Sequence, residues 1–118
     1  MSLNVKFEIT KDLQEKALDA VEKARASGKI KKGSNEATKA IERGVAKAVF
    51  YAADVSPKEI IEHIPVIAKE KKIPWFEVDS KQKLGVAVGI PVSTSAVAII
   101  DAGQADKEID ALKKSGGD

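Results

Sequence analysis

Residues 48–53 read AVFYAA, an apolar run in which no polar residue alternates with the hydrophobic ones. A strand with one wet face alternates apolar and polar residues, whereas a strand covered on both faces is apolar throughout. The run therefore predicts a central strand with helices on both sides of its sheet. Residues 96–100, AVAII, predict a second covered strand, and residues 74–78, PWFEV, predict a third.

Amphipathic segments with helix start and stop signals alternate with these strands. The expected helices run from a cap at Thr10 to Ser27, from a cap at Ser34 to near Gly44, from Ser56 through an interruption at Pro65 to Lys71, from Ser80 to Gly89, and from about Gln104 to Lys114. Covered strands between such helices predict an α/β protein, a three-layer α/β/α sandwich on a mixed sheet. We expect one domain over residues 1–118, with residues 115–118 as a loose tail.

The composition excludes several classes of protein. The 118 residues are enough for one buried core, and the absence of cysteine excludes disulfide frameworks, thiolate zinc sites and cysteine nucleophiles. No stretch approaches the roughly 18 apolar residues that a membrane span needs. We therefore expect a soluble cytoplasmic protein without a membrane partner.

The net charge of +2 is unevenly distributed. Residues 23–47 contain eight cations and two anions, a local charge of +6, so the rest of the chain carries −4. A basic segment on a mildly acidic body is a plausible footprint for a polyanion, because neutralised phosphates release counterions. The same pattern also fits an ordinary solvated helix face, and charge alone leaves both interpretations open.

The basic segment contains residues 31–44, KKGSNEATKAIERG, in which a helix is expected to begin at Ser34. The free N–H groups of a first helical turn favour an anion such as phosphate, and so do Gly33, which allows close approach, and Lys32. A carboxylate at Glu36 is repelled by phosphates unless it accepts hydrogen bonds, and an exposed guanine edge offers N–H donors.

Asn35, Lys39 and Arg43 follow at four-residue steps on the same helix face. Asn35 and Lys39 suit the remaining base acceptors, so the pattern favours open base edges, as in sheared G·A pairs, over a regular A-form groove. Asparagine and glutamate are also common at ordinary helix starts, where they cap the helix and complement its dipole. The residues themselves do not decide between these interpretations.

Lys31 to Gly44 resembles the RNA-binding signature of the family of the archaeal large-subunit ribosomal protein seven-Ae, related to eukaryotic box C/D and box H/ACA core proteins. The similarity continues through 48–57, 73–74, 80–89 and 95–100, nearly the whole chain. The resemblance implies a non-catalytic protein that binds kink-turns and kink-loops and stabilises the bend. The implied partners are ribosomal RNA, box C/D and H/ACA guide RNAs and ribonucleoprotein proteins, with ribonuclease P RNA as a further candidate, and no cofactor or metal is implied.

The resemblance also implies roles for individual residues. Asn35, Glu36 and Lys39 match positions that contact the tandem G·A pairs, and Lys32 and Arg43 would support the phosphates; Gly33 and Ser34 belong to the same contact. Ile90-Pro91-Val92 matches an apolar loop that packs against an extruded nucleotide, and Lys81 matches a basic residue beside it. Many relatives are acidic where this chain has Pro91, which leaves the loop-nucleotide preference open.

An isoleucine, a proline and a valine after Gly89 would also give an unstacked base a rigid apolar surface on physical grounds. Ile90 and Val92 equally fit the ends of the hydrophobic core. His63, the one histidine, has no cysteine or second histidine near it, so it predicts neither a metal site nor a general base.

Two other functional classes stay open. Residues 33–39 faintly resemble a phosphate loop but lack its second glycine and its Ser/Thr, so a nucleotide-binding enzyme has weak support. A protein-interaction scaffold could instead use the acidic stretch from Asp101 to Asp110.

Overall fold

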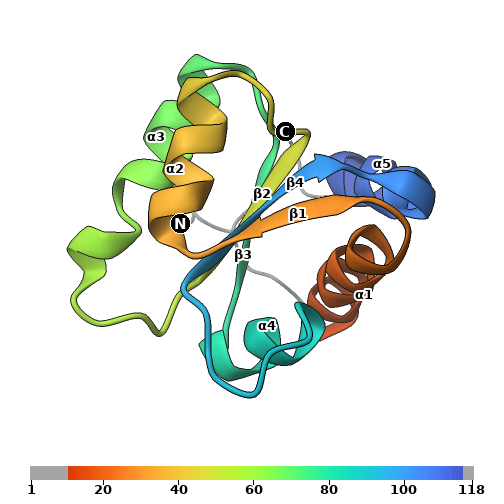
Figure 1. Cartoon of the computed structure of the whole chain (residues 1–118), viewed down its shortest axis with the longest axis horizontal. Helices are drawn as coiled ribbons and strands as arrows, with labels where there is room; N and C mark the ends of the chain where they lie inside the picture. The colour runs from red at the N-terminus through yellow and green to blue at the C-terminus, as the bar shows by residue number, and fades with distance from the viewer. Residues whose placement is uncertain (1–10, 116–118) are drawn as a thin grey trace.

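The computed structural model describes residues 11–115 and shows a four-stranded mixed sheet between two layers of helices (Figure 1). The strands lie in the order β1-β4-β2-β3, with β2 parallel to β3 and β4 antiparallel to both β1 and β2. The strands are β1 (Lys29–Lys32), β2 (Ala48–Ala52), β3 (Trp75–Val78) and β4 (Ala96–Asp101). The helices described are α1 (Lys11–Ser27), α2 (Ser34–Glu42), η2 (Lys58–Ile60), α3 (His63–Glu70), α4 (Lys81–Ala87), η3 (Gly103–Ala105) and α5 (Asp106–Ser115).

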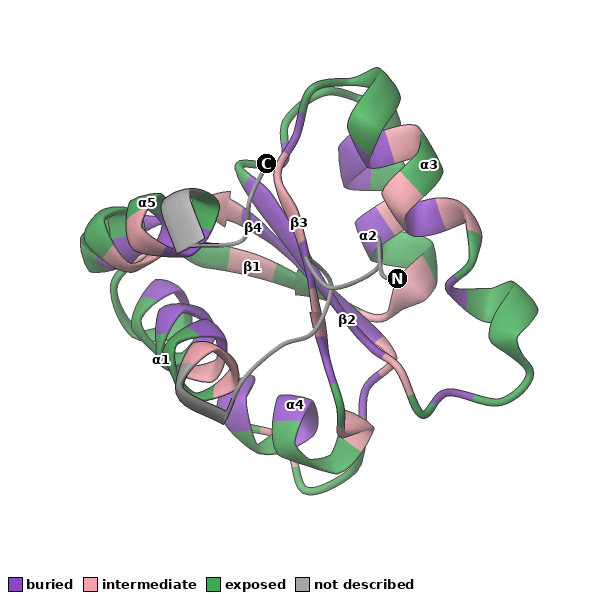
Figure 2. Cartoon of the chain, turned by 180° about the vertical axis from the view of Figure 1, so that it is seen from behind, coloured by how far each residue is buried: buried purple, intermediate pink, exposed green. Residues whose placement is uncertain are grey.

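The two helical layers cover opposite faces of the sheet. Helices α2 and α3 lie on one face, and α1, α4 and α5 lie on the other, as both Figure 1 and the reverse view in Figure 2 show. All five residues of β2 are buried, and the Phe50 and Phe76 rings of neighbouring strands lie with their centroids 5.2 Å apart. The α/β/α sandwich and the central position of the AVFYAA run are confirmed.

Strand β1 was not predicted. It is an edge strand of sequence KIKK, in which only Ile30 packs against the core. Three lysines in four residues give no apolar alternation, because an edge strand needs only a small inward face and often carries lysine outside. Its pairing with β4, Ile30 opposite Ile99 and Lys32 opposite Val97, is a tertiary contact that no local pattern encodes.

Two helix starts were predicted wrongly. The N-cap of α2 is Gly33, and Ser34 is the first helical residue, without a side-chain cap bond. The segment at Ser56 does not open a long helix: Ser56-Pro57 is a cis peptide, η2 follows, and α3 begins only at His63. Pro65 therefore lies in the first turn of α3, where its missing N–H has no intrahelical acceptor to lose, and does not interrupt a helix.

The second half of the chain matches the expectation closely. The Ser80 hydroxyl oxygen accepts a hydrogen bond from the Lys83 N–H at 3.1 Å, which confirms the cap of α4. Gly89 has φ +80°, the left-handed conformation that ends a helix. Ser115 belongs to α5 and not to a tail, while the Thr10 cap and residues 116–118 lie outside the described residues. None of the helices described between residues 11 and 115 has the length and apolar character to span a membrane.

Candidate functional site

The start of α2 is held in an unusual backbone conformation at Gly33. Its φ of +95° and ψ of 153° lie in a region that is essentially restricted to glycine. Nothing lies within 4 Å of a Cβ built there, so the backbone conformation, and not crowding, requires glycine. The Gly33 carbonyl accepts from the Ala37 N–H at 2.9 Å, and its own N–H donates to the Ala96 carbonyl at 2.7 Å.

Helix α2 has one buried and one exposed face. Ala37, Ala40 and Ile41 are buried against the sheet. The opposite side is exposed and carries four of the predicted site residues: Asn35, Glu36, Lys39 and Arg43. The first-turn N–H groups have no intrahelical acceptor, so this exposed end presents backbone donors as well as side chains.

Arg43 lies farthest from the start of α2. It is the C-cap of α2, nine residues beyond Ser34, which at 1.5 Å per residue is roughly 13 Å along the helix axis. The structure therefore spreads the four residues along α2, with Asn35 and Glu36 in its first turn, Lys39 in its last turn and Arg43 at its C-cap. A ligand that contacts all four must extend along the helix.

Glu36 and Lys39 form a loose ion pair. The Lys39 Nζ lies 3.7 Å from the Glu36 carboxylate, and the two side chains are 56% and 48% exposed. An exposed pair of this kind contributes little to stability and is screened by salt. Both side chains thus remain available to a ligand.

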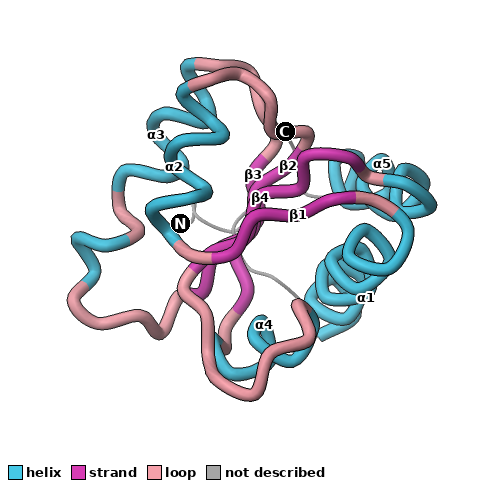
Figure 3. The backbone as a smooth tube through the Cα atoms, viewed as in Figure 1, coloured by secondary structure: helices cyan, strands magenta, loops and turns pink. Residues whose placement is uncertain are grey.

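The loop that joins α4 to β4 reaches the same end of the sheet (Figure 3). Ile90 is half-buried and packs against the core, whereas Pro91 and Val92 are exposed, Val92 by 65%. Ile90 and Val92 were both compatible with the ends of the hydrophobic core. In the structure Ile90 packs against the core, whereas the Val92 side chain is mostly exposed. Pro91 and Val92 form an apolar surface that is open to solvent.

Lys81 is fixed beside this loop. Its N–H donates to the Asp54 carboxylate at 2.9 Å, and its carbonyl accepts from the Thr94 N–H at 3.1 Å. The side chain itself is half-buried. The first residue of α4 and the end of the loop are thereby connected through the backbone.

Two residues outside the predicted set hold the loop in place. A Cβ at Gly85 in α4 would lie 2.0 Å from the Val92 carbonyl oxygen, so the loop packs directly on the helix backbone. The Arg25 guanidinium of α1 lies against Gly89, and its Nε donates to the Ala87 carbonyl at 3.3 Å. A glycine inside a helix is a visible sequence signal for close approach, but no local pattern connects Arg25 with residues 87–89.

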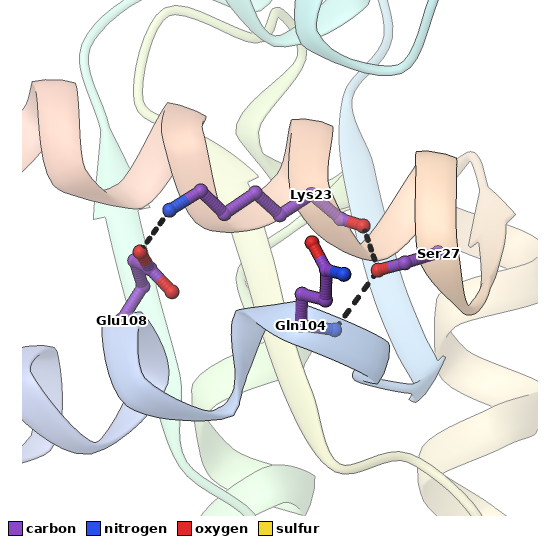
Figure 4. A network of polar contacts seen from close by, with 4 residues as sticks. All are labelled: Lys23, Ser27, Gln104 and Glu108. Atoms are coloured by element: carbon purple, nitrogen blue, oxygen red, sulfur yellow. Dashed lines mark hydrogen bonds and ion pairs between the residues drawn. The ribbon is translucent and has the colours of Figure 1, made fainter.

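The basic segment is divided between two surfaces. Lys23 forms an ion pair with Glu108 of α5, away from α2 (Figure 4). Its hydrogen bond to Glu108 lowers the pKa of that carboxyl. Asp101 accepts from the Gly103 N–H at 3.1 Å. Two carboxylates of the acidic stretch from 101 to 110 are therefore engaged within the protein.

No metal site accompanies these features in the described part of the chain, where no group of three or more His, Asp or Glu side chains is arranged to hold an ion. His63 instead contacts α2: its Nε2 lies 2.7 Å from the Thr38 hydroxyl oxygen. The histidine thus connects two helices.

Comparison with known proteins identifies a matching family and a similar solved structure. The family described as ribosomal protein L7Ae/L30e/S12e/Gadd45 matches residues 15–109. Among solved structures, the Giardia lamblia 15.5kD RNA binding protein is similar, with a TM-score of 0.76 and 32% sequence identity. The similarity covers 92% of this chain and 88% of that one.

Proposed function

The chain belongs to the ribosomal protein L7Ae/L30e/S12e/Gadd45 family, and on that premise we propose that it is a non-catalytic RNA-binding protein that recognises and stabilises kink-turn and kink-loop RNA. The similar Giardia lamblia structure is that of an RNA binding protein, which supports the binding class over an enzyme. The kink-turn specificity rests on the arrangement of the site residues.

One observation carries the proposal: the Gly33 N–H donates to the Ala96 carbonyl at 2.7 Å. This bond joins the start of α2, with its polar end at Asn35 and Glu36, to the residue that follows the 90–95 loop. The two segments of opposite character are therefore attached to the same end of β4. A bent RNA offers both ligands at once, exposed base edges for the polar end and an unstacked nucleotide for the apolar loop.

Glu36 explains why a regular duplex is a poor ligand. Close to phosphates, an exposed carboxylate is favourable only where base N–H donors reach it, and such donors are accessible in sheared G·A pairs. Lys32 and Lys39 offset the backbone charge nearby. The protein shifts RNA toward the bent form only by its higher affinity for that form.

The proposed partners in the cell are ribosomal RNA of the large subunit and box C/D and box H/ACA guide RNAs. Ribonuclease P RNA is a further RNA to test. We also propose that the protein binds other proteins of these ribonucleoproteins and that it acts in the cytoplasm.

The proposal is tested by titrating the purified protein into a labelled kink-turn RNA and into a variant whose G·A pairs are replaced by Watson–Crick pairs. We expect tight binding to the first RNA and weak, salt-sensitive binding to the second. Equal affinity for both RNAs would show that base edges are not read.

Removal of the Asn35 or the Glu36 side chain tests the proposed contact at the start of α2 directly. Asn35→Ala or Glu36→Ala should weaken kink-turn binding about tenfold or more, the loss expected for hydrogen bonds to base edges, and should change duplex binding little. Glu42→Ala removes the same charge from the other end of α2, and Gln104→Ala removes an exposed amide elsewhere. Both controls should bind as the wild type does.

A further inference from the structure

Strand β1 carries a row of exposed lysines, of which the proposed contacts with the kink use Lys32 alone. Lys29, Lys31 and Lys32 are exposed, while Ile30 between them packs against the core and fixes the strand. β1 has β4 on one side and is the edge of the sheet on the other. The lysines therefore lie along an accessible border of the molecule.

The lysines of β1 form no ion pair with the side chains that the structure describes, those of residues 13–113. Within that range the ion pairs use Lys23 and Lys39. Asp101 is opposite Lys29 in the strand register, and its carboxylate accepts from the Gly103 N–H. The border thus carries three lysines beside this one carboxylate and keeps an excess of positive charge.

The row is continuous with the proposed RNA site. Lys32 precedes Gly33, whose bond to Ala96 fixes the end of β1 and the start of α2 relative to each other. In Figure 1, β1 runs from the end of α1 to the start of α2 along the front of the sheet. At a rise of about 3.3 Å per residue, the strand extends the positive surface roughly 13 Å from Gly33 to Lys29.

We propose that the β1 border binds the phosphate backbone of one of the two helical stems that flank the bend. The inference rests on the proposed function and adds the part of the RNA that lies outside the kink. Lysine is a compact, strongly hydrated charge that contacts phosphates without reading bases. The β1 border therefore supplies salt-dependent affinity, while discrimination between bent and straight RNA comes from α2.

The alternative role of these lysines is protection of an open strand edge from pairing with other chains. Salt dependence separates the two roles, because each phosphate contact releases counterions and contributes about one to the slope of log affinity against log salt. Edge protection contributes nothing to that slope.

The test compares the wild type with the double variant Lys29→Gln/Lys31→Gln in kink-turn titrations over a series of salt concentrations. We expect the slope to fall by about two and the preference for the kink-turn over its Watson–Crick variant to stay unchanged. Lys107→Gln/Lys113→Gln on α5 removes the same charge from exposed positions and should leave the slope as in the wild type. Thermal unfolding of both variants checks that each is folded.

Shortening the RNA stems one at a time identifies the stem. With one shortened stem, the wild type and the Lys29→Gln/Lys31→Gln variant should have the same slope. Two results would overturn this inference and leave the proposed function standing. One is a salt slope of the double variant on the full RNA that equals that of the wild type. The other is a difference in slope between the two proteins that persists whichever stem is shortened. Loss of kink-turn preference in the wild type would instead overturn the proposed function, and this inference with it.

Discussion

Gly85 is the residue on which the position of the apolar loop depends most directly. A Cβ at this position would lie 2.0 Å from the Val92 carbonyl oxygen, which is backbone and cannot rotate away. Gly85→Ala should therefore displace the 90–95 loop and cost about 1–3 kcal/mol in the free energy of unfolding, the range for overpacking. Kink-turn affinity should fall about fivefold, as for loss of about 1 kcal/mol of contact with an unstacked base.

Urea unfolding and RNA titration measure the two effects of Gly85→Ala. Gln82→Ala, at an exposed position of the same helix, is the control for helix composition. Unchanged affinity in a destabilised Gly85→Ala variant would mean that the loop does not contribute to RNA binding.

Glu77 makes stability depend on pH. Burial raises the pKa of its carboxyl, and Lys58 partly opposes that rise. The folded state then holds its proton more tightly than the unfolded state, so this group favours folding at low pH and loses that contribution as pH rises through the raised pKa. Glu77→Gln should be more stable than the wild type at pH 7.

The stability gap between Glu77→Gln and the wild type should close below the ordinary carboxyl pKa of 4.5, because the wild-type side chain is then protonated in both states. Urea unfolding at several pH values measures the gap. The exposed Glu59→Gln removes the same formal charge and controls for the change in net charge. A gap of the same size at pH 7 and at pH 4 would contradict the assignment.

At the scale of elements, α2 is fixed at two points: to β4 by the bond from Gly33 to Ala96, and to α3 by the 2.7 Å contact between Thr38 and His63. The second contact is partly buried, so its loss has a measurable cost. Thr38→Val should reduce the free energy of unfolding by about 1 kcal/mol, the usual net value of one hydrogen bond.

A double-mutant cycle of Thr38→Val with His63→Leu isolates the contact between α2 and α3. The two changes should be less costly together than the sum of the single changes, because each alone already breaks the bond. Strict additivity in urea unfolding would mean that the two side chains do not interact in solution.

Local sequence patterns predicted the elements whose signals are local. The apolar run at 48–53 predicted a covered strand, and Ser80 with Gly89 gave the limits of the fourth helix. Strand β1 was missed because its stability comes from β4, almost seventy residues later in the chain. The cap signal at Ser56 was misleading because a serine and a proline suit a turn as well as a helix start.

The same distinction applies to the candidate site. Asn35, Glu36 and Lys39 were visible as a group because one helix face collects them at i, i+1 and i+4. The supports at Gly85 and Arg25 were not assigned, since each acts on a segment from another element. Sequence thus identified the candidate contact residues, and the fold was needed to show what holds them.

At the scale of the whole molecule, η3, which leads into α5, is bound to α1 at the end of β4 opposite Ala96. The Ser27 hydroxyl donates to the Lys23 carbonyl at 2.6 Å and accepts from the Gln104 N–H at 2.9 Å (Figure 4). Ser27→Ala should lower the free energy of unfolding by about 1 kcal/mol. The preference for the kink-turn over its Watson–Crick variant should not change, because β4 separates this contact from Ala96 by roughly 17 Å.

Thermal unfolding and kink-turn titration test this separation of stability from binding. Gln104→Ala keeps the backbone N–H that Ser27 accepts, so it should retain the stability that Ser27→Ala loses. Loss of the kink-turn preference by Ser27→Ala at a temperature where it is fully folded would show that the two ends of β4 are coupled.

Both segments of the proposed RNA site are attached to Ala96, the first residue of β4, so we expect recognition to be lost as a whole and not in parts. If Ala96 leaves the sheet, the tip of α2 and the apolar loop lose their common support together. A short peptide copied from residues 31–44 would keep the positive charge but have no fixed partner surface, and so would bind nucleic acid without selectivity. A ligand that binds both segments binds the folded state alone and stabilises it by mass action. The melting temperature of the protein should therefore rise with the concentration of bent RNA.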